Sequence, residues 1–393
     1  MIAERELSTT EARHRLDTLC QLLNLKCTVS HQDGHALVAT CTLYSLSGEE
    51  TSAGAGKGQH CMLGAVAESL EHHFLGNCTT DGAQMTSGDL IQSLARGHDD
   101  WLLNSVPTSS QLSAYRMEAL EGDSSLYVPS ILLNPSSRYI KEANETEAAF
   151  LSKYSSNSGM ALGCTENEAL LHAINECIER HALSVYFLST CQLMPALTVM
   201  KPSLALLTET FSENANLLAH SRRLSIYMLN DFYGLFFCIA MAAPEHESTL
   251  AIIGSGCSAS ASVALYRAVT EQLQCAHLRG DQEKDEDHDT YRMLSTSTRL
   301  SKLLNPVTRA KLAELKPAAC VTSLRKQIQH TTANLKAHGR SVFYRTLFNE
   351  PGLACAVQAY IPGLERFHLI RSGLPVVPQS ALSQGARAPH VYL

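Results

Sequence analysis

Three stretches of the sequence place acidic and basic residues at helical spacing, each directly after a segment rich in small residues. The first follows GAGKGQ and carries Glu68 and Glu71. The third follows GSGCSASAS and carries Arg267, Glu271 and Gln274. The second follows NSGMALGCT and has five polar residues at steps of four, four, three and one: Glu168, His172, Glu176, Glu179 and Arg180. Because steps of three and four stay on one helical face, each stretch predicts a helix with a polar stripe.

Carboxylates gathered from three helices would need a cation between them, because like charges at close range raise one another's pKa. Mg²⁺ prefers oxygen ligands and typically joins one or two carboxylates to substrate phosphates. We therefore expect a magnesium site built from the glutamates of the three helices: Glu68, Glu71, Glu176, Glu179 and Glu271. Arg180, Arg267 and Lys57 would hold phosphate oxygens, and a helix start behind a Gly-rich turn favours the same ligand. The combination predicts a nucleoside triphosphate site.

A solvent-exposed face would explain the same spacing without any ligand. Glu176–Arg180 and Arg267–Glu271 are i, i+4 pairs, which commonly decorate exposed helices and contribute about 0.2–0.5 kcal/mol each. Because the pattern of a small-residue segment before a polar helix occurs three times, we favour a nucleotide site over a solvent-exposed face. Two standard nucleotide motifs do not fit. A P-loop would need Gly in place of Thr51 and Ser or Thr in place of Gly58, and the segment 254–259 is not followed by the strand with a terminal acidic residue of a dinucleotide fingerprint.

The composition is that of a globular protein, with 45% hydrophobic and 18% charged residues in a chain of 393. The net charge of −7 and the lack of a basic cluster with aromatic residues argue against nucleic acid as a partner. No apolar run is long enough to cross a membrane, and the polar N-terminus is not a secretory signal. The 13 cysteines form no C-x-x-C pair, so we expect reduced thiols, no structural zinc and a cytoplasmic location.

The elements that must position the polar residues alternate between helices and strands. Apolar spacing predicts a first helix over 11–26, and β-branched and apolar runs predict strands over 37–46, 126–133, 224–229, 235–243 and 249–253. We expect the three polar helices to end near residues 74, 187 and 278, and the small-residue segments before them to be loops, at 51–58, 155–165 and 254–260. The charged segment 279–290 is expected to be a solvated loop or a frayed helix end.

In this order the motifs resemble the YcaO family, whose members carry E-x-x-E, E-x-x-E-R and R-A-x-T-E-x-x-Q helices, each after a Gly-rich loop. Here they are ESLE (Glu68–Glu71), ECIER (Glu176–Arg180) and RAVTEQLQ (Arg267–Gln274). The segment GCTENE (Gly163–Glu168) and a late PGLE turn also look like the family's. The resemblance covers roughly residues 35 to 385. It implies an α+β, YcaO-type fold with mixed sheets and three helices converging on a nucleotide site, divided into an N-terminal helical segment (1–35) and a catalytic domain (36–393).

The resemblance also implies ATP and Mg²⁺ as cofactors and a reaction on a ribosomal precursor peptide. A Cys, Ser or Thr side chain attacks the preceding carbonyl, ATP phosphorylates the resulting oxygen, and phosphate leaves as a thiazoline or oxazoline forms. By motif position the five glutamates above would bind the metal. The implied nucleotide contacts are Lys57, Glu168, His172, Arg180, Arg267 and Gln274. The implied catalytic residues are Glu179, Arg180, Arg267 and, through its terminal carboxylate as base, Leu393.

The chain departs from the family pattern at a few positions. Cys164 stands in place of Asn, and Lys57 lies three residues later than the family's lysine when Glu68 is aligned. Beside the peptide substrate, the resemblance implies a separate leader-binding docking subunit and a flavin-dependent azoline dehydrogenase as partners. The same fold leaves thioamide or amidine formation open, as well as a non-catalytic scaffold subunit. An unrelated ATP-grasp-like ligase lacks support, because its glycine-rich lid pattern is absent.

Overall fold

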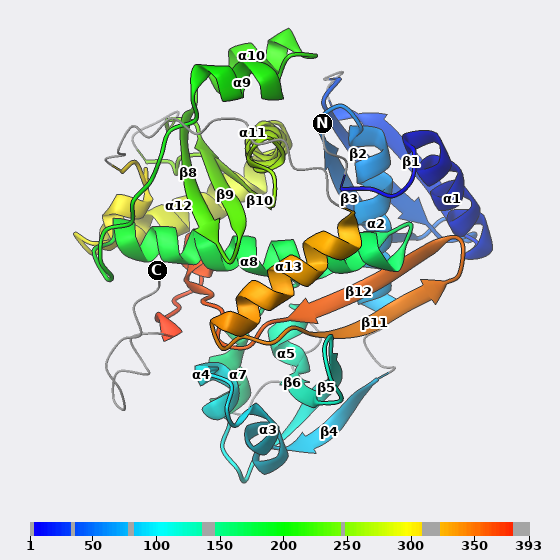
Figure 1. The fold of residues 1–393 in the computed structure, drawn as a ribbon, viewed down its shortest axis with the longest axis vertical. Helices are drawn as coiled ribbons and strands as arrows, with labels where there is room; N and C mark the ends of the chain where they lie inside the picture. Colours follow the sequence, from blue (N-terminus) through cyan, green and yellow to red (C-terminus); the bar gives the residue numbers. More distant parts are fainter. Residues whose placement is uncertain are drawn as a thin grey trace.

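A computed structural model describes residues 4–32, 36–77, 82–135, 146–244, 248–308 and 323–379. Helices and antiparallel sheets are mixed along the chain, which confirms the α+β class (Figure 1). The long helix α8 (Glu166–Thr190) runs through the middle of the molecule and is buried along most of its length. None of the helices within the described ranges is long and apolar enough to cross a membrane.

Two similar units lie side by side above α8 (Figure 1). The first has the strand order β1 (Lys26–His31), β2 (Val38–Tyr44) and β3 (Glu50–Lys57), and helix α2 (Cys61–Asn77) packs on β3 and β2. Helix α1 (Thr9–Leu22) packs on α2 and begins with a capping box between Ser8 and Glu11. The β1–β2 ladder joins residues on both sides of position 35, where the sequence places its domain boundary.

The second unit repeats this order. Strands β8 (Ser225–Phe232), β9 (Leu235–Met241) and β10 (Ile253–Ser258) form an antiparallel sheet, and helix α11 (Ala261–Leu278) packs on β10 and β9. The short helices α9 (Leu204–Thr210) and α10 (Ala215–Ser221) pack on α11. In both units a meander of three strands therefore leads into a helix that lies back on its last strand.

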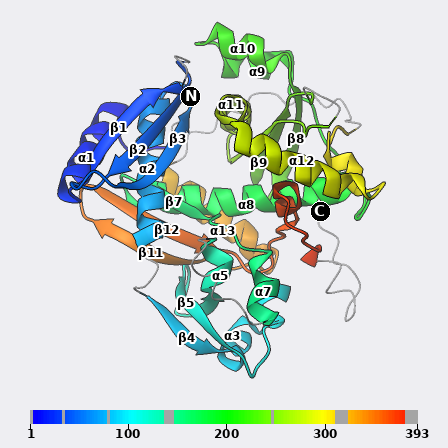
Figure 2. The ribbon, with the colours of Figure 1, turned by 180° about the vertical axis from the view of Figure 1, so that it is seen from behind.

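A larger sheet forms the third part of the fold, and β7 and β12 lie below α8 when the molecule is seen from behind (Figure 2). Its order is β4 (Ala83–Ser87), β5 (Gln111–Ala119), β11 (Phe343–Glu350), β12 (Ala354–Tyr360) and β7 (Met160–Gly163), with β6 (Ser125–Pro129) paired to β5. Helix α13 (Leu324–Ala337) packs on α8. The remaining helices surround these parts: α3 (Gly88–Ala95), α4 (Trp101–Asn104), α5 (Ser130–Leu133), α7 (Thr146–Ser152), α12 (Asp281–Ser295), η2 (Leu300–Leu303) and η3 (Phe367–Ser372).

The expected small-residue loops are wrong, because each segment contains a strand: β3, β7 and β10. Their glycines serve close packing of strand on helix. A Cβ atom on Gly56 would lie 1.8 Å from the carbonyl oxygen of Cys61, and one on Gly254 would lie 2.1 Å from the backbone nitrogen of Gln272. The predicted strand 249–253 is therefore displaced toward β10. The predicted strand 126–133 ends at Pro129 and continues as α5, and the charged segment after residue 280 is the helix α12.

Candidate nucleotide site

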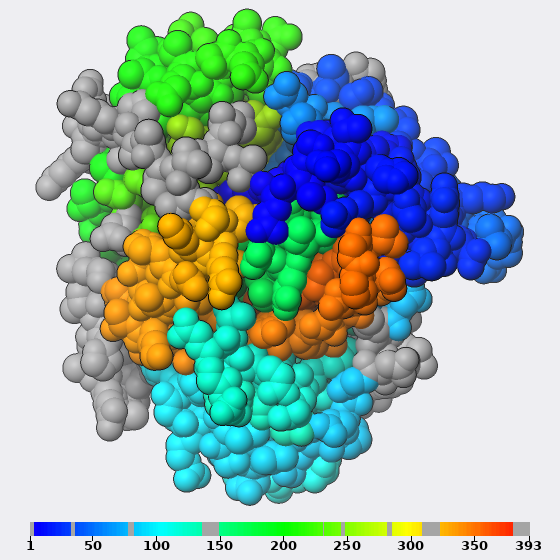
Figure 3. Space-filling view, turned by 45° about the vertical axis from the view of Figure 1, so that its right-hand side comes forward, coloured from blue at the N-terminus to red at the C-terminus, as the bar shows by residue number. Residues whose placement is uncertain are grey.

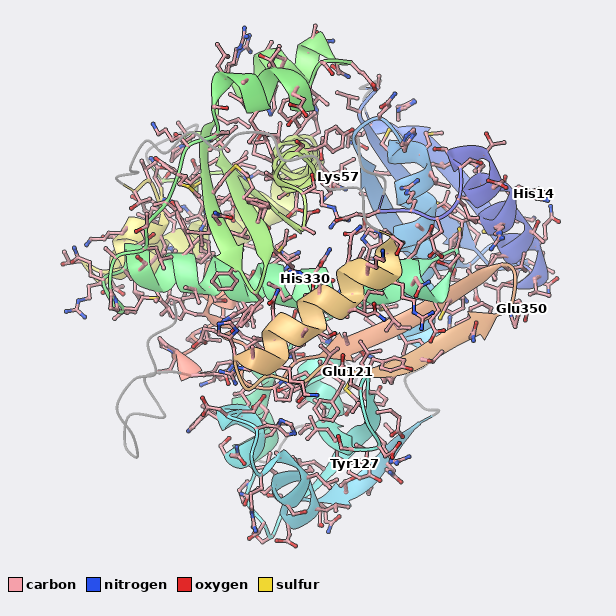
Figure 4. The ribbon with its side chains drawn as sticks, in the orientation of Figure 1. His14, Lys57, Glu121, Tyr127, His330 and Glu350 are labelled. Atoms are coloured by element: carbon pink, nitrogen blue, oxygen red, sulfur yellow. The ribbon has the colours of Figure 1, made fainter. Side chains whose placement is uncertain are left out.

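The five predicted metal-site glutamates come from α2, α8 and α11 and lie within electrostatic range of one another. Each glutamate interacts electrostatically with at least one other member of the group. The interactions link neighbours in the order Glu71, Glu68, Glu271, Glu176 and Glu179. Lys57, at the end of β3, forms an ion pair with Glu271 on α11 and so joins the two similar units. In Figure 4 Lys57 lies between α11 and the N-terminal sheet, above α8.

Strand backbones hold the glutamates in place. In the first unit the N–H of Ala55, between Gly54 and Gly56, donates to Glu68, and in the second unit the N–H of Ser255 donates to Glu271. The glycines on either side make this reach possible, because any larger residue would push the strand away from its helix. The same geometry thus fixes one carboxylate of each unit against the last strand of that unit.

The other three carboxylates are bonded across elements. Glu71 Oε1 accepts from the N–H of Leu162 on β7 at 2.8 Å, and Glu176 Oε2 accepts from the N–H of Gly159 at 3.1 Å. Glu179 Oε1 accepts from the hydroxyl of Ser255 at 2.6 Å. Since a hydrogen-bonded carboxylate keeps a fixed orientation, these contacts arrange the acidic group before any ligand arrives.

Burial gives several of these carboxyl groups unusual pKa values. Burial raises the pKa of Glu71 to about 8, with Glu68 and Glu176 adding to the effect, and raises the pKa of Glu176 to about 7. The pKa of Glu68 is raised for the same reason. Glu271 is the exception: burial would raise its pKa, but the charges of Lys57 and Arg180 outweigh burial and lower it. The group therefore carries fewer negative charges near neutral pH than its five carboxylates suggest.

Arg180 lies between the acidic group and a pocket. Its Nε is 3.7 Å from Glu176 Oε1 and its Nη1 is 3.9 Å from Glu179 Oε1. Burial would lower the pKa of Arg180, but these two glutamates and Glu271 outweigh it and raise the pKa. Besides Arg180, the pocket is lined by Ser156, Ser158, Cys177, Glu365 and His368 among others. Apolar residues such as Ile361 and Leu364 complete the lining, so the guanidinium of Arg180 joins the acidic group to a pocket of mixed character.

The remaining predicted nucleotide contacts are engaged by the N-terminal segment. Glu168 accepts hydrogen bonds from the N–H of Cys164 at 2.8 Å and from the N–H of Glu6 at 2.6 Å. Arg267 donates to His172 Nδ1 at 2.8 Å and pairs with Glu4. Two further predictions, Gln274 and Leu393, have different outcomes. Gln274 is buried on α11 three residues beyond Glu271, and Leu393 lies outside the described residues.

Sequence reasoning missed the N-terminal residues of this site. Burial, with Arg267 and Arg5 adding to the effect, lowers the pKa of His172 to about 3, so this ring is neutral. Arg5 Nη1 is buried and has no hydrogen-bond partner among the described residues. Residues 4–6 carry no periodic or motif signal, and their partners lie more than 150 positions away in the chain. By contrast, Ser255 and Ser258 belong to a segment that the sequence had already marked.

The residues present fit a magnesium–nucleotide complex in their chemistry. No three acidic, imidazole or thiol side chains of the described ranges converge on one point as a closed metal site would require. Mg²⁺ bound with a nucleotide does not need such a site, because phosphates and waters supply most of its ligands. The grouped carboxylates are suited to Mg²⁺, and Lys57, Arg180 and Arg5 Nη1, which has no hydrogen-bond partner in the described part of the chain, are suited to phosphate oxygens.

Fold and site together define an α+β protein with an acidic and basic centre suited to ATP and Mg²⁺. A family model described as YcaO cyclodehydratase, ATP- and Mg²⁺-binding, matches residues 56–365. The chain therefore belongs to the YcaO family, and the cofactors of that family are ATP and Mg²⁺. A search of curated protein sequences finds no match.

Solved structures share the fold at low sequence identity. A heterocyclase in complex with substrate and cofactor is 15% identical with a TM-score of 0.63, over 93% of this chain but only 54% of the heterocyclase chain. YcaO from Methanopyrus kandleri, bound with AMPPCP and Mg²⁺, is 15% identical with a TM-score of 0.61, over 95% of this chain and 96% of the other. A chain of the E. coli microcin synthetase McbBCD complex is 16% identical with a TM-score of 0.52, over 85% and 86%. This chain thus spans about half the length of the heterocyclase.

Binding of Mg²⁺ with ATP is expected to release protons near neutral pH. Glu71 and Glu176, with pKa values of about 8 and about 7, bind protons there, and a metal ligand must be deprotonated. Because their pKa values lie above the ordinary value, affinity should rise with pH through about 7 to 8 and level off above about 9. Calorimetry in buffers of different ionisation enthalpy measures the protons released, and Glu71→Gln should lower the number. An affinity that is independent of pH, with no proton release, would contradict this assignment.

Proposed function

We propose that this protein is an ATP-dependent cyclodehydratase that converts Cys, Ser or Thr residues of a ribosomal precursor peptide into thiazolines or oxazolines. The observation that carries the proposal is the position of Arg180, which lies 3.7 and 3.9 Å from two glutamates of the acidic group and also lines a pocket of mixed polar and apolar character. A phosphate bound on one side of Arg180 would then lie near a peptide amide on the other. Membership in the YcaO family supports the reaction class.

When bound, ATP supplies the phosphoryl group that turns the amide oxygen into a leaving group. The residues of this chain provide position and charge, which supply most of the rate in phosphoryl transfer. Lys57 and Arg180 offset the negative charge of phosphate oxygens, and the glutamates hold Mg²⁺. His368 lines the pocket, and burial, with Arg180 and Arg366 adding to the effect, lowers its pKa well below the ordinary value. This imidazole is neutral, and because a strongly lowered pKa makes it a weak base, it is suited to orient an attacking thiol or hydroxyl by accepting a hydrogen bond and not to remove its proton.

We further propose that the chain acts as one subunit of a multi-protein synthetase in the cytoplasm. Its partners would be a leader-binding docking subunit and a flavin-dependent azoline dehydrogenase. Similarity to a chain of the McbBCD complex, which has also been solved with pro-MccB17 bound, supports an assembly of this kind. An activity of the purified chain alone that equals that of the complex would remove the need for partners.

Mass spectrometry of a candidate precursor peptide, incubated with ATP, Mg²⁺ and the partner proteins, tests the reaction. Cyclodehydration removes one water for each modified residue and requires a Cys, Ser or Thr at that position. Replacement of an amide oxygen by sulfur, when sulfide is supplied, would instead identify a thioamide-forming enzyme. A complex that turns over no ATP and leaves the peptide unchanged, although it binds the peptide, would identify a scaffold subunit.

A further inference from the structure

The N-terminal segment Glu4–Glu6 reaches the site from outside the region that matches the family model. In Figure 3 the darkest blue residues, at the N-terminus, lie against green residues in the middle of the molecule. We propose that Glu4 is a positioning residue for nucleotide binding, which acts by fixing Arg267 and His172. The inference rests on the nucleotide site of the proposed function and adds a residue to it.

Glu4 is attached at three points, each on a different element. The hydroxyl of Ser258, at the end of β10, donates to Glu4 Oε1 at 2.6 Å. Arg267 Nη2 on α11 pairs with Glu4 Oε2, and the ring of His172 on α8 hydrogen-bonds to the Glu4 backbone. Only 6% of Glu4 is exposed. A carboxylate that merely approached a basic site from solvent would not be enclosed in this way.

The contacts fix the tautomer of His172. A guanidinium group only donates hydrogen bonds, so His172 Nδ1 must accept from Arg267, at 2.8 Å. The ring proton of the neutral imidazole is then on the other nitrogen, which donates to the backbone carbonyl of Glu4. Glu4, Arg267 and His172 therefore form a closed set, in which each residue contacts the other two.

This set also fixes the plane of the Arg267 guanidinium. Its hydrogen bonds to His172 and to the carbonyl oxygen of Cys257, at 3.2 Å, use two of its five N–H groups, and its ion pair with Glu4 is the third anchor. The remaining N–H groups are held in a constant direction, because the guanidinium is rigid and planar. Without Glu4, Arg267 would lose one of its three anchors. Arg5, the next residue in the chain, would no longer be held in place through Glu4.

The sign of the effect separates positioning from simple electrostatics. A carboxylate near a polyanion repels it, so removing the charge of Glu4 should by itself strengthen nucleotide binding. A positioning role predicts the opposite result, because Arg267 loses its fixed direction.

The test is calorimetric titration of the full chain, with its native N-terminus, using Mg²⁺ with ATP and Mg²⁺ with AMPPCP. Glu4→Gln is expected to weaken binding of both nucleotides at least about tenfold, as expected when an ordered ligand contact is lost. Glu6→Gln is the matched control, because it removes the same charge from the same segment. Glu6 meets Glu168 through its backbone N–H, which the exchange leaves in place. Among the described residues its carboxylate accepts a hydrogen bond from the side chain of Asn167, at 3.0 Å, so this variant should bind within about twofold of the unchanged chain.

Two further measurements distinguish a positioning role of Glu4 from a purely structural one. In an Arg267→Gln background, Glu4→Gln should cause little additional loss, because residues that act through one contact are not additive. Ser258→Ala removes one contact of the Glu4 carboxylate without a charge change, and should weaken binding in the same direction but by less. It serves as the readout if Glu4→Gln fails to fold in a thermal melt.

Unchanged or tighter nucleotide binding by a folded Glu4→Gln variant would overturn the inference and leave the proposed function intact. Equal losses of affinity in the presence and absence of Arg267 would overturn it as well. If the unchanged chain binds neither nucleotide, the nucleotide site of the proposed function fails, and the role of Glu4 fails with it.

Discussion

Exchange of Glu179 for Gln is expected to reduce ATP-dependent modification of the peptide by about 100-fold to 1,000-fold, the range for loss of one preorganised electrostatic contact. Glu179 is only 7% exposed, accepts a hydrogen bond from Ser255, and lies 3.9 Å from Arg180. Gln keeps the size of the side chain and an acceptor for Ser255. What it removes is the negative charge, which orients Arg180 and which we propose also binds Mg²⁺.

Initial rates of peptide modification and of ATP hydrolysis, measured together with a thermal melt, give the readout for Glu179→Gln. The matched control is Glu166→Gln, which makes the same change in the first turn of α8, where Glu166 is exposed and belongs to no part of the acidic group. The control should retain nearly full activity. A Glu179→Gln variant that folds and works as fast as the control would rule out Glu179 as part of the reacting centre.

The helices that carry this chemistry could be predicted from the sequence, because their polar residues recur at steps of three and four. Glu176, Glu179 and Arg180 fall on α8 where expected, and Arg267 and Glu271 fall on α11. A helix keeps its period whatever surrounds it, so spacing alone identifies the polar face. The pattern of a small-residue segment before a polar helix occurs three times, and this repetition suggested that the three polar faces converge. Only the fold, however, brings Lys57 to Glu271, across 214 positions.

The strands before these helices could not be predicted in the same way. Gly54, Gly56, Gly254 and Gly256 suggested loops, because glycine most often marks a turn. Here each glycine lies in a strand, and none of the four has the left-handed backbone conformation that a turn glycine needs. Whether a glycine permits a turn or a close approach depends on what packs against it, which is a property of the tertiary structure. Residues 4–6 escaped prediction for a related reason, since nothing local marks their distant partners.

Gly56→Ala is expected to destabilise the fold by about 3 kcal/mol or more, at the upper end of the range for overpacking. The new Cβ would lie 1.8 Å from the Cys61 carbonyl oxygen and 2.5 Å from the Ala65 nitrogen, which are backbone atoms that no side-chain rotation can move. Denaturant unfolding followed by circular dichroism measures the loss. The control is Gly76→Ala near the end of α2, the helix that packs on β3, where a Cβ meets nothing within 4 Å. That variant should gain about 0.5–1 kcal/mol from helix propensity.

The consequence of Gly56→Ala for the site is more specific than lost stability. To accept a Cβ at position 56, β3 must move away from α2, and the N–H of Ala55 then loses its reach to Glu68. Lys57, the next residue of β3, would move away from Glu271 in the same step. Variant protein that still folds should therefore bind Mg²⁺ with ATP more weakly than the Gly76→Ala control. Unaltered binding in a destabilised Gly56→Ala variant would mean that the strand can shift without disturbing the acidic group, and the glycine pairs would then serve packing alone.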